Sequence, residues 1–458
     1  MRKTVYLFCF LTFALSAYAG EYLVPIDGKM ATVSRFGGDE RICVADQCYM
    51  VVDESKLDWY TSTQMASSEP EPVLYYELFA APTSDQQWGP NLEGWDDAKN
   101  NVIDLYATSR KPIAAIIDTG MEYPHSGIAN TVLHTTPNGK HGYIVDDNGE
   151  IYDMSWHGTH VAGIIGGTYD GSTGVKGTGF GKVKVLPFMV ASEPGSLPLT
   201  YILIAIDKII KLKQQGNDIV AVNMSYGQKQ YSRIEHDAMR ALKDAGIIAV
   251  VAAGNDSANL STYNTYPANY NVENIITVTA LDPSRKVASY ANYGGTTSIA
   301  APGSAISTVP PYSELDHDGD GYGISHGTSM ATPFITGAIS AAFALNNTLT
   351  PQQAMHLLYN SARNNVNLSG KVINNREIDL YGFMRAVQTC KTSPSCNYNS
   401  YPPRPIMSEP SSSSGSGSGG RGGALGRVGG CAINPAASFN ITALVLACGL
   451  FIIRRRMG

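Results

Sequence analysis

Three short segments of the chain carry side chains that together could transfer an acyl group. Asp118 begins Asp-Thr-Gly, His157 begins His-Gly-Thr-His-Val-Ala-Gly, and Ser329 lies in Gly-Thr-Ser-Met-Ala-Thr-Pro. A serine hydroxyl is a weak nucleophile unless a base takes its proton, and a histidine near neutral pH suits that task. The histidine in turn needs an anion to orient it. The sequence therefore predicts Ser329 as nucleophile, His157 as general base and Asp118 as the residue that orients the base.

Each segment taken alone also has a plain structural explanation. Asp118 follows an apolar run and could be a turn residue, and Ser329 could be a helix N-cap. His157 and His160 are three residues apart, which invites a zinc site, but a zinc peptidase helix needs Glu where Gly158 stands. The zinc interpretation is therefore rejected, and the catalytic roles of Asp118, His157 and Ser329 are inferred because the three segments occur together.

Apolar runs and helical patterns between about residues 90 and 390 would form the framework for these side chains. The runs expected to be strands are 113–117, 183–188, 219–223, 247–253 and 275–279, and helical spacing is seen over 202–209 and 238–245. Nearly continuous apolar strands that alternate with helices predict a three-layer α/β fold with a mainly parallel central sheet. Functional groups of such folds collect beyond the carboxyl ends of the strands, where Asp118 would lie.

In their order along the chain, the three segments resemble those of the subtilisin-like serine protease family. The resemblance covers roughly residues 85 to 385 and implies a subtilisin-like fold, the roles given above, and hydrolysis of peptide bonds through an acyl-enzyme. Ala252-Ala253-Gly254-Asn255 resembles the family's oxyanion segment. This implies that Asn255 stabilises the tetrahedral intermediate together with the Ser329 backbone N–H. Without the resemblance, Asn255 would be read as a turn residue after a strand.

Ser225-Tyr226-Gly227 resembles the strand edge on which the family binds extended substrate by backbone pairing, and Gly254 would lie beside it. Tyr226 could supply an aromatic wall to a subsite or could simply be exposed. The expected substrates are proteins or peptides. A catalytically silent binding module of the same fold would be marked by loss of a catalytic residue, and none is lost. An esterase that uses the same serine remains a second alternative.

An acidic segment ahead of Ser329 could bind calcium. Asp316, Asp318 and Asp320 stand at alternate positions with Gly321 at the sixth, as in the first half of a calcium loop. The twelfth position is Gly327 instead of a bidentate Glu, which excludes an EF-hand. A structural calcium ion and a solvated acidic loop are both left open, and the chemistry itself requires no cofactor.

The N-terminal part has the features of an exported protein. Two basic residues precede an apolar run over about 5–15 and the pattern Ala17-Tyr18-Ala19. The run is shorter than the roughly 20 residues of a membrane span, so residues 1–19 are predicted to be a cleaved signal peptide. Residues 20–80 occupy the place where the family commonly carries a folding-assisting, inhibitory propeptide; an N-terminal module kept in the mature enzyme is the alternative. The peptidase domain is expected over residues 81–396.

The composition changes again toward the C-terminus. Residues 397–430 are rich in Ser, Gly and Pro and predict a flexible linker. Residues 431–458 hold an apolar segment followed by Arg454-Arg455-Arg456, which resembles the sorting tails of Gram-negative exported proteins. A membrane protease removes such tails, whereas a permanent anchor is the alternative. Either way we expect an exported protein at the cell surface, at the outer membrane or outside the cell, with a transient or permanent membrane segment.

Charge and cysteine content complete the expectations. The net charge of -6 and the absence of a basic stripe argue against nucleic acid as a partner. Export permits disulfides, and proximity in the sequence favours Cys43 with Cys48 and Cys390 with Cys396. The other connectivities of these four cysteines and free buried thiols stay open.

Overall fold

The structure is a computed structural model of the whole chain. It describes residues 21–26, 40–44, 47–53, 71–72, 75–78, 87–123, 125–128, 139–145, 149–169, 174–310, 313–316, 321–393 and 396. All of them belong to one compact unit of the chain, Met1–Glu409. The predicted signal peptide, linker and C-terminal tail lie outside the described residues.

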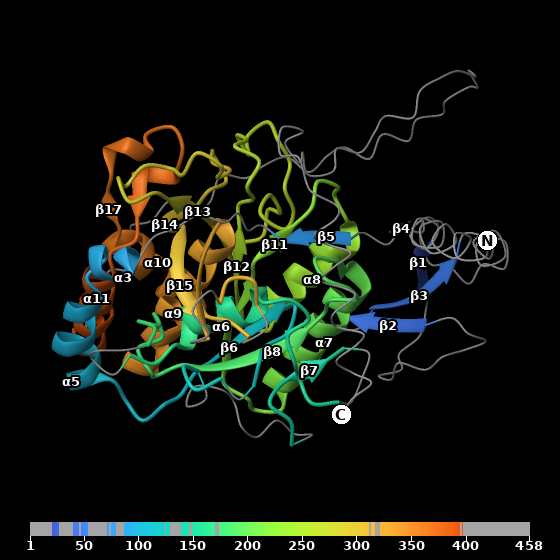
Figure 1. Ribbon diagram of the computed structural model, residues 1–458, viewed down its shortest axis with the longest axis horizontal. Helices are drawn as coiled ribbons and strands as arrows, with labels where there is room; N and C mark the ends of the chain where they lie inside the picture. The colour runs from blue at the N-terminus through green and yellow to red at the C-terminus, as the bar shows by residue number, and fades with distance from the viewer. Residues whose placement is uncertain are drawn as a thin grey trace, which may run out of the picture. The chain divides into compact units, whose positions relative to one another are not determined.

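A nine-stranded sheet forms the centre of the described fold (Figure 1). In spatial order its strands are β17 (Arg363–Asn364), β18 (Arg376–Glu377), β14 (Ile299–Pro302), β13 (Ile275–Leu281), β12 (Ile248–Ala252), β10 (Ile219–Met224), β6 (Ile113–Asp118), β8 (Lys184–Met189) and β7 (Tyr143–Ile144). Neighbouring strands are parallel except β17 and β18. The predicted α/β fold with a mainly parallel sheet is confirmed, and the ends of each predicted strand shift by at most two residues.

Helices cover both faces of this sheet. One face carries α6 (His157–Gly166) and α9 (Thr328–Leu345), and the other carries α7 (Leu199–Gln214) and α8 (Arg233–Asp244). Successive side chains of β6 alternate between the two cores: Ala114 and Ile116 pack with α6 and α9, whereas Ile113, Ala115 and Ile117 pack with α7 and α8. The strand is apolar throughout because neither face meets water.

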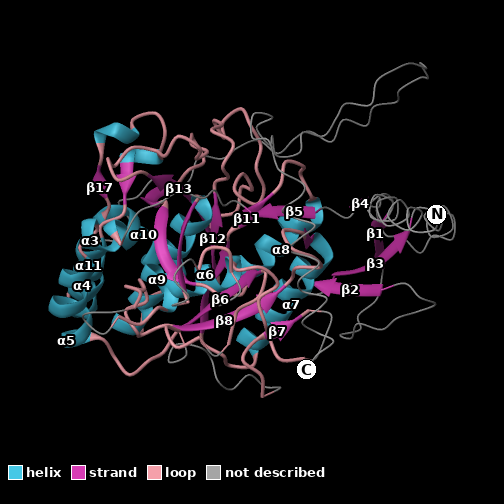
Figure 2. Cartoon of the chain, in the orientation of Figure 1, coloured by secondary structure: helices cyan, strands magenta, loops and turns pink. Residues whose placement is uncertain are grey.

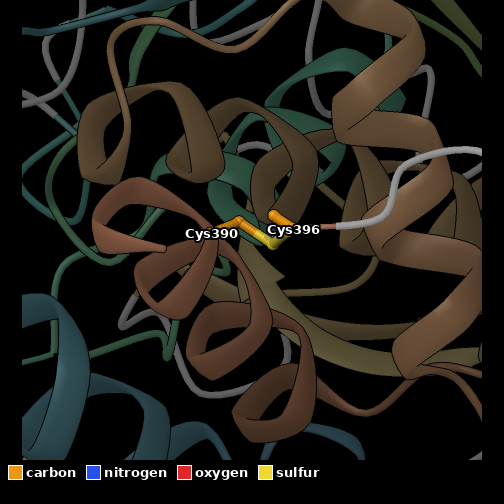
Figure 3. Close-up of a disulfide and its surroundings, with 2 residues drawn as sticks. All are labelled: Cys390 and Cys396. Atoms are coloured by element: carbon orange, nitrogen blue, oxygen red, sulfur yellow. A yellow bond between two sulfur atoms is a disulfide. The ribbon is translucent and has the colours of Figure 1, made fainter. Parts of the chain in front are cut away.

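Shorter elements surround these layers. Before β6 lie α3 (Trp88–Leu92), α4 (Trp95–Ala98), a π-helical turn (Lys99–Ile103) and α5 (Asp104–Tyr106). A hairpin of β15 (Ser304–Thr308) and β16 (Tyr322–His326) precedes α9, and α10 (Pro351–Ser361), two 3-10 turns (Val366–Leu368 and Ile373–Asn375) and α11 (Leu380–Thr392) follow it. Cys390 in α11 forms a disulfide with Cys396, their Cα atoms being 5.2 Å apart (Figure 3).

The N-terminal strands form a separate four-stranded antiparallel sheet in the order β2-β3-β1-β4. Its strands are β1 (Glu21–Ile26), β2 (Glu40–Val44), β3 (Gln47–Asp53) and β4 (Glu71–Pro72). The register of the β2–β3 hairpin sets Cys43 opposite Cys48. Opposed residues of an antiparallel pair are at a separation that a disulfide can span, and the bond between these two cysteines stays a prediction.

The strand that follows the N-terminal sheet in the chain pairs with two strands of the main fold instead. β5 (Tyr75–Leu78) lies between β11 (Tyr226–Gly227) and β9 (Leu197–Pro198) and runs antiparallel to both. Figure 2 shows β5 beside β11. Tyr226 is opposite Leu78 and Gly227 is opposite Glu77. A segment from the start of the chain is therefore held by backbone pairing on the edge that was expected to bind substrate.

The helix α9 occupies the interior of the fold. Among the described residues it alone is long and apolar enough to cross a membrane, yet all of its residues are buried inside the protein. Its apolarity is accounted for by its contacts with α6 and with the strands of the sheet. The predicted C-terminal membrane segment is a different part of the chain and lies outside the described residues.

Candidate active site

The predicted site residues lie at the carboxyl ends of neighbouring parallel strands. Asp118 is the last residue of β6, Ser225 follows β10, and Asn255 lies three residues beyond the end of β12. The chain adds β8 on one side of β6 and β10 on the other, so the strand order reverses at β6. Such a reversal opens a crevice at the carboxyl edge of the sheet, because the following helices leave on opposite faces.

Asp118 and His157 contact each other in this crevice. Nδ1 of His157 lies 2.7 Å from Oδ1 of Asp118, and the same oxygen accepts the backbone N–H of Thr119 at 2.8 Å. Both side chains are fully buried. A buried carboxylate on Nδ1 fixes the tautomer that leaves Nε2 as the basic nitrogen, and among the described residues Nε2 of His157 has no hydrogen-bond partner.

Two glycines allow the segments that carry this pair to approach closely. Gly120 has a φ of 120°, and a Cβ at this position would lie 1.9 Å from the carbonyl oxygen of Tyr152. A Cβ on Gly158 would lie 2.1 Å from the carbonyl oxygen of Gly120. The glycines of Asp-Thr-Gly and His-Gly-Thr are therefore required because the two backbones touch.

Ser329 is the second residue of α9 and faces the end of β10. Its hydroxyl donates to the carbonyl oxygen of Ser225 at 3.1 Å, and the Ser225 hydroxyl donates to the carbonyl oxygen of Ser329 at 2.9 Å. In this structure the Ser329 hydroxyl therefore points to Ser225 and makes no hydrogen bond with His157. A serine of an unliganded site often takes its catalytic hydrogen bond only when substrate binds. Near the helix N-terminus, the backbone N–H groups favour a developing anion.

Asn255 is held by the residue that precedes the serine. Its Oδ1 accepts both the backbone N–H and the hydroxyl of Thr328 at 3.0 Å each. The Thr328 hydroxyl also accepts the N–H of Gly254 at 3.1 Å. With Oδ1 engaged, Nδ2 is left to donate, and no described residue accepts from it. No role for Thr328 follows from the sequence alone, although it stands in the Gly-Thr-Ser motif.

Tyr226 is placed differently from the expectation. Its side chain is fully buried in the core beneath α7 and α8, so it does not form an open aromatic wall. Burial, followed by the charges of Glu235 and Asp118, raises the pKa of the Tyr226 phenol well above its usual value. Tyr226 and Gly227 present their backbone to a neighbouring strand, which is the position that β5 occupies.

His160 lies one helical turn after His157 and has no contact suited to catalysis. It is fully buried, and its Nε2 is 3.2 Å from the carbonyl oxygen of Gly323. Burial, and to a smaller extent the nearby His157, lowers the pKa of His160 to about 3. Its imidazole is therefore neutral and structural.

The predicted calcium residues are only partly covered by the structure. Asp316 is half-buried, and its carboxylate accepts the N–H of Gly321 at 3.2 Å. Asp318 and Asp320 lie outside the described residues. Within the described part of the chain there is no group of three or more His, Cys, Asp or Glu residues that could hold a metal ion. The calcium site thus stays a prediction.

A comparison with known sequences identifies the family. Residues 109–379 match the sequence profile of the Subtilase family. The chain belongs to this family. The matched region includes Asp118, His157, Asn255 and Ser329. It excludes the N-terminal sheet and β5, which the Subtilase profile does not reach.

Several curated relatives of the chain are named as proteases. The chain is 31% identical to an extracellular protease of Xanthomonas campestris pv. campestris over 65% of this chain and 55% of the relative. It is 32% identical to halolysin of Haloferax mediterranei (61% and 50%) and 31% identical to a thermophilic serine proteinase of Bacillus sp. strain AK1 (57% and 61%). The chain spans 50 to 61% of the length of these relatives.

A solved structure described as proteases from Pseudoalteromonas arctica has a similar fold. It superposes with a TM-score of 0.51 over 66% of this chain and 100% of that chain, at 23% sequence identity. The likeness supports the subtilisin-like arrangement of layers around the parallel sheet.

Proposed function

We propose that this subtilase is a serine endopeptidase that hydrolyses peptide bonds of proteins or peptides through an acyl-enzyme. The observation that carries the proposal is the buried 2.7 Å contact between Asp118 and His157, at the sheet edge that also holds Ser329 and Asn255. The proteases among its relatives support the same reaction.

In the proposed mechanism, Nε2 of His157 takes the proton of the Ser329 hydroxyl while Oγ attacks the carbonyl carbon of the scissile bond. Asp118 holds the imidazole in its tautomer and stabilises the imidazolium that forms. Asn255 Nδ2 and the Ser329 backbone N–H would donate to the oxyanion of the tetrahedral intermediate. His157 then gives its proton to the leaving amine. A water molecule next attacks the ester carbonyl carbon while His157 takes a proton from it, and His157 returns this proton to Oγ of Ser329 as the acid product leaves.

The first experiment compares matured wild-type protein with Ser329→Ala on casein and a peptide library, with products identified by mass spectrometry. We expect cleavage only by the wild type. Ser340→Ala is a matched control, because it removes a buried hydroxyl from the same helix far from the sheet edge. The proposal is wrong if folded, matured wild type cuts no peptide and a fluorophosphonate leaves Ser329 unlabelled. That result would favour the binding module, and cleavage of short esters alone would favour an esterase.

We further propose that residues 20–80 are a propeptide that inhibits the peptidase until it is cut. β5 pairs with β11 and β9 as an extended substrate would, and both His157 and Ser329 are inaccessible to solvent. Main-chain pairing of this kind gives affinity with little dependence on sequence. An N-terminal module kept in the mature enzyme is the alternative, and N-terminal sequencing of the secreted protein distinguishes the two.

The register of β5 also indicates where the chain would be cut. A substrate strand in this register places the residue after Leu78 opposite Ser225, whose carbonyl accepts the Ser329 hydroxyl. In the sequence that residue is Phe79, which lies outside the described residues. We therefore expect the first cut shortly after β5, near the end of the segment 20–80.

The proposed localisation is export followed by loss of the C-terminal tail. The relatives named as extracellular proteases support export. A signal peptide over residues 1–19, a peptidase domain ending near residue 396 and a sorting tail over 431–458 are proposals from the sequence. Intact-mass measurement of the mature protein tests them: a mass that includes the tail would indicate a permanent anchor.

A structural calcium ion at Asp316, Asp318 and Asp320 is likewise proposed from the sequence pattern. Carboxylate oxygens suit calcium, and the chemistry above uses no cofactor. A calorimetric titration of the Ser329→Ala protein without binding at millimolar calcium would remove this proposal.

A further inference from the structure

A buried carboxylate joins the segment after β6 to the start of α6. Asp153 has 2% of its surface exposed. Its Oδ1 accepts the Thr119 hydroxyl at 2.7 Å and the N–H of Ser155 at 3.1 Å. Its Oδ2 accepts both the N–H and the hydroxyl of Thr159, at 2.7 and 2.5 Å. Every one of these donors lies within two residues of Asp118, Asp153 or His157 in the sequence.

The two threonine hydroxyls link the segments reciprocally. Thr119, next to Asp118, accepts the N–H of Gly158 at 2.9 Å, and Thr159, in α6, accepts the N–H of Glu122 at 2.8 Å. Each hydroxyl thus donates to Asp153. The Thr119 hydroxyl accepts an N–H of α6, and the Thr159 hydroxyl accepts an N–H of the segment after β6. We call Asp153, Thr119 and Thr159 the Asp153 bracket.

The Asp153 bracket also supplies hydrogen-bond acceptors to the first N–H groups of α6. The residue at the N-cap position, Trp156, has no side-chain cap. The N–H groups of Gly158 and Thr159, which have no partner within the helix, are accepted by Thr119 and Asp153 instead. Burial raises the pKa of Asp153, whereas the hydrogen bonds from Thr159 and Thr119 lower it. The positive end of α6 further stabilises the carboxylate form.

We propose that Asp153 is a positioning residue for the reaction, acting through the Asp153 bracket on the distance between Asp118 and His157. The proposal rests on the peptidase function above. Thr119 is bonded directly to Asp118 and Gly158 directly to His157, so the 2.9 Å bond between them sets the spacing of the catalytic pair. Without the carboxylate, the Thr119 hydroxyl is free to rotate and the two segments lose their shared acceptor.

The test compares Asp153→Asn and Thr119→Val with Thr119→Ser. The valine keeps the shape of threonine but removes the hydroxyl, and the serine restores it. A displacement of about 1 Å at a catalytic pair costs up to about 100-fold in rate. We expect kcat to fall 10- to 100-fold for Asp153→Asn and Thr119→Val with KM unchanged, and Thr119→Ser to recover most of it.

The pH profile separates positioning from mere stability. A looser contact between Asp118 and His157 stabilises the imidazolium less, so the acidic limb of the kcat/KM profile is expected to move to lower pH in both Asp153→Asn and Thr119→Val. Wild-type kcat and pH profile in Asp153→Asn and Thr119→Val, with only the melting temperature lowered, would overturn the proposal.

A readout without turnover distinguishes this proposal from the proposed function. In Ser329→Ala protein, the Nδ1 proton of His157 that is shared with Asp118 gives a downfield NMR signal, which we expect to shift or broaden in Asp153→Asn. An unchanged signal refutes the Asp153 bracket even if the wild type is an active peptidase. A changed signal in a wild type that cuts nothing supports the bracket and refutes only the peptidase.

Discussion

A buried pair of carboxyl groups predicts that the fold becomes less stable as the pH rises from about 4.5 to about 8. Glu93, at the end of α3, and Glu377, in β18, are both fully buried. Arg363 forms an ion pair with Glu93 and lies 3.8 Å from Glu377, and Arg285 lies 2.5 Å from Glu377. Burial is the largest cause that raises the pKa of Glu93, from 4.5 to about 8, and Glu377 adds to it, while Arg363 opposes the rise.

The sign and the size of the effect follow from this pKa. Between pH 4.5 and about 8 the folded protein keeps a proton on Glu93 that the unfolded chain has lost. The free energy of unfolding therefore falls with rising pH, by about 1.4 kcal/mol per unit for one proton. From pH 6 to pH 8 the loss is on the order of 2 kcal/mol. It is complete once the pH passes the folded-state pKa.

The assay is urea unfolding of the full chain between pH 5 and pH 9, in the Ser329→Ala background so that the protein does not digest itself. Glu93→Gln mimics the protonated carboxyl at every pH. We expect this variant to match the parent near pH 5 and to exceed its stability by on the order of 3 kcal/mol at pH 8. Glu273→Gln is the matched control, at an exposed carboxylate 2.9 Å from Lys243.

Glu93 does not hold the proton if the unfolding free energies of the parent and Glu93→Gln depend on pH in the same way. The same conclusion follows if Glu273→Gln changes the pH dependence as much as Glu93→Gln does.

Three further predictions concern the site. Asn255→Ala is expected to lower kcat about 100- to 1000-fold with little change in KM, the magnitude established for an oxyanion amide in this family, and steady-state kinetics on a peptide substrate measures it. Gly158→Ala brings a methyl group within 2.1 Å of the Gly120 carbonyl oxygen, so we expect a large loss of melting temperature by calorimetry; an unaltered value would contradict the required close approach. A synthetic peptide with the sequence of residues 75–79 should inhibit the matured enzyme competitively, and a scrambled peptide should not.

The sequence was sufficient to predict the framework of the site. Strands covered on both faces leave runs of apolar residues, so β6, β10, β12 and β13 were found within two residues of their ends. Parallel strands carry their carboxyl ends to one edge, which explains why Asp118, Ser225 and Asn255 meet although they are far apart in the chain.

The side chain of Tyr226 is buried, which differs from both the subsite wall and the exposed side chain that the sequence analysis left open, although the sequence holds a signal for its burial. Side chains alternate along extended backbone, so if Ser225 faces Ser329, its neighbour must face the other way, into the core. The place of Tyr226 on the substrate-binding edge stays a prediction.

Asp153 and β5 could not be predicted for different reasons. Asp153 lies in irregular backbone, and its partners Thr119 and Thr159 become neighbours only when β6 and α6 pack. β5 is four residues long, and its pairing with β11 joins segments about 150 residues apart. No local pattern of residues encodes such a long-range pairing.

The burial of α9 and its late position in the chain determine when the site can form during synthesis. Asp118, His157 and Asn255 all leave the ribosome before Ser329, which arrives together with the helix that fills the space beside β10, β12 and β13. Until then the part of this sheet face that α9 covers is exposed apolar surface, and the contacts between distant segments that α9 makes are missing. A nascent chain that ends before α9 therefore lacks the core on that face of the sheet and the proposed nucleophile at the same time, although the core beneath α7 and α8 is made only of earlier residues.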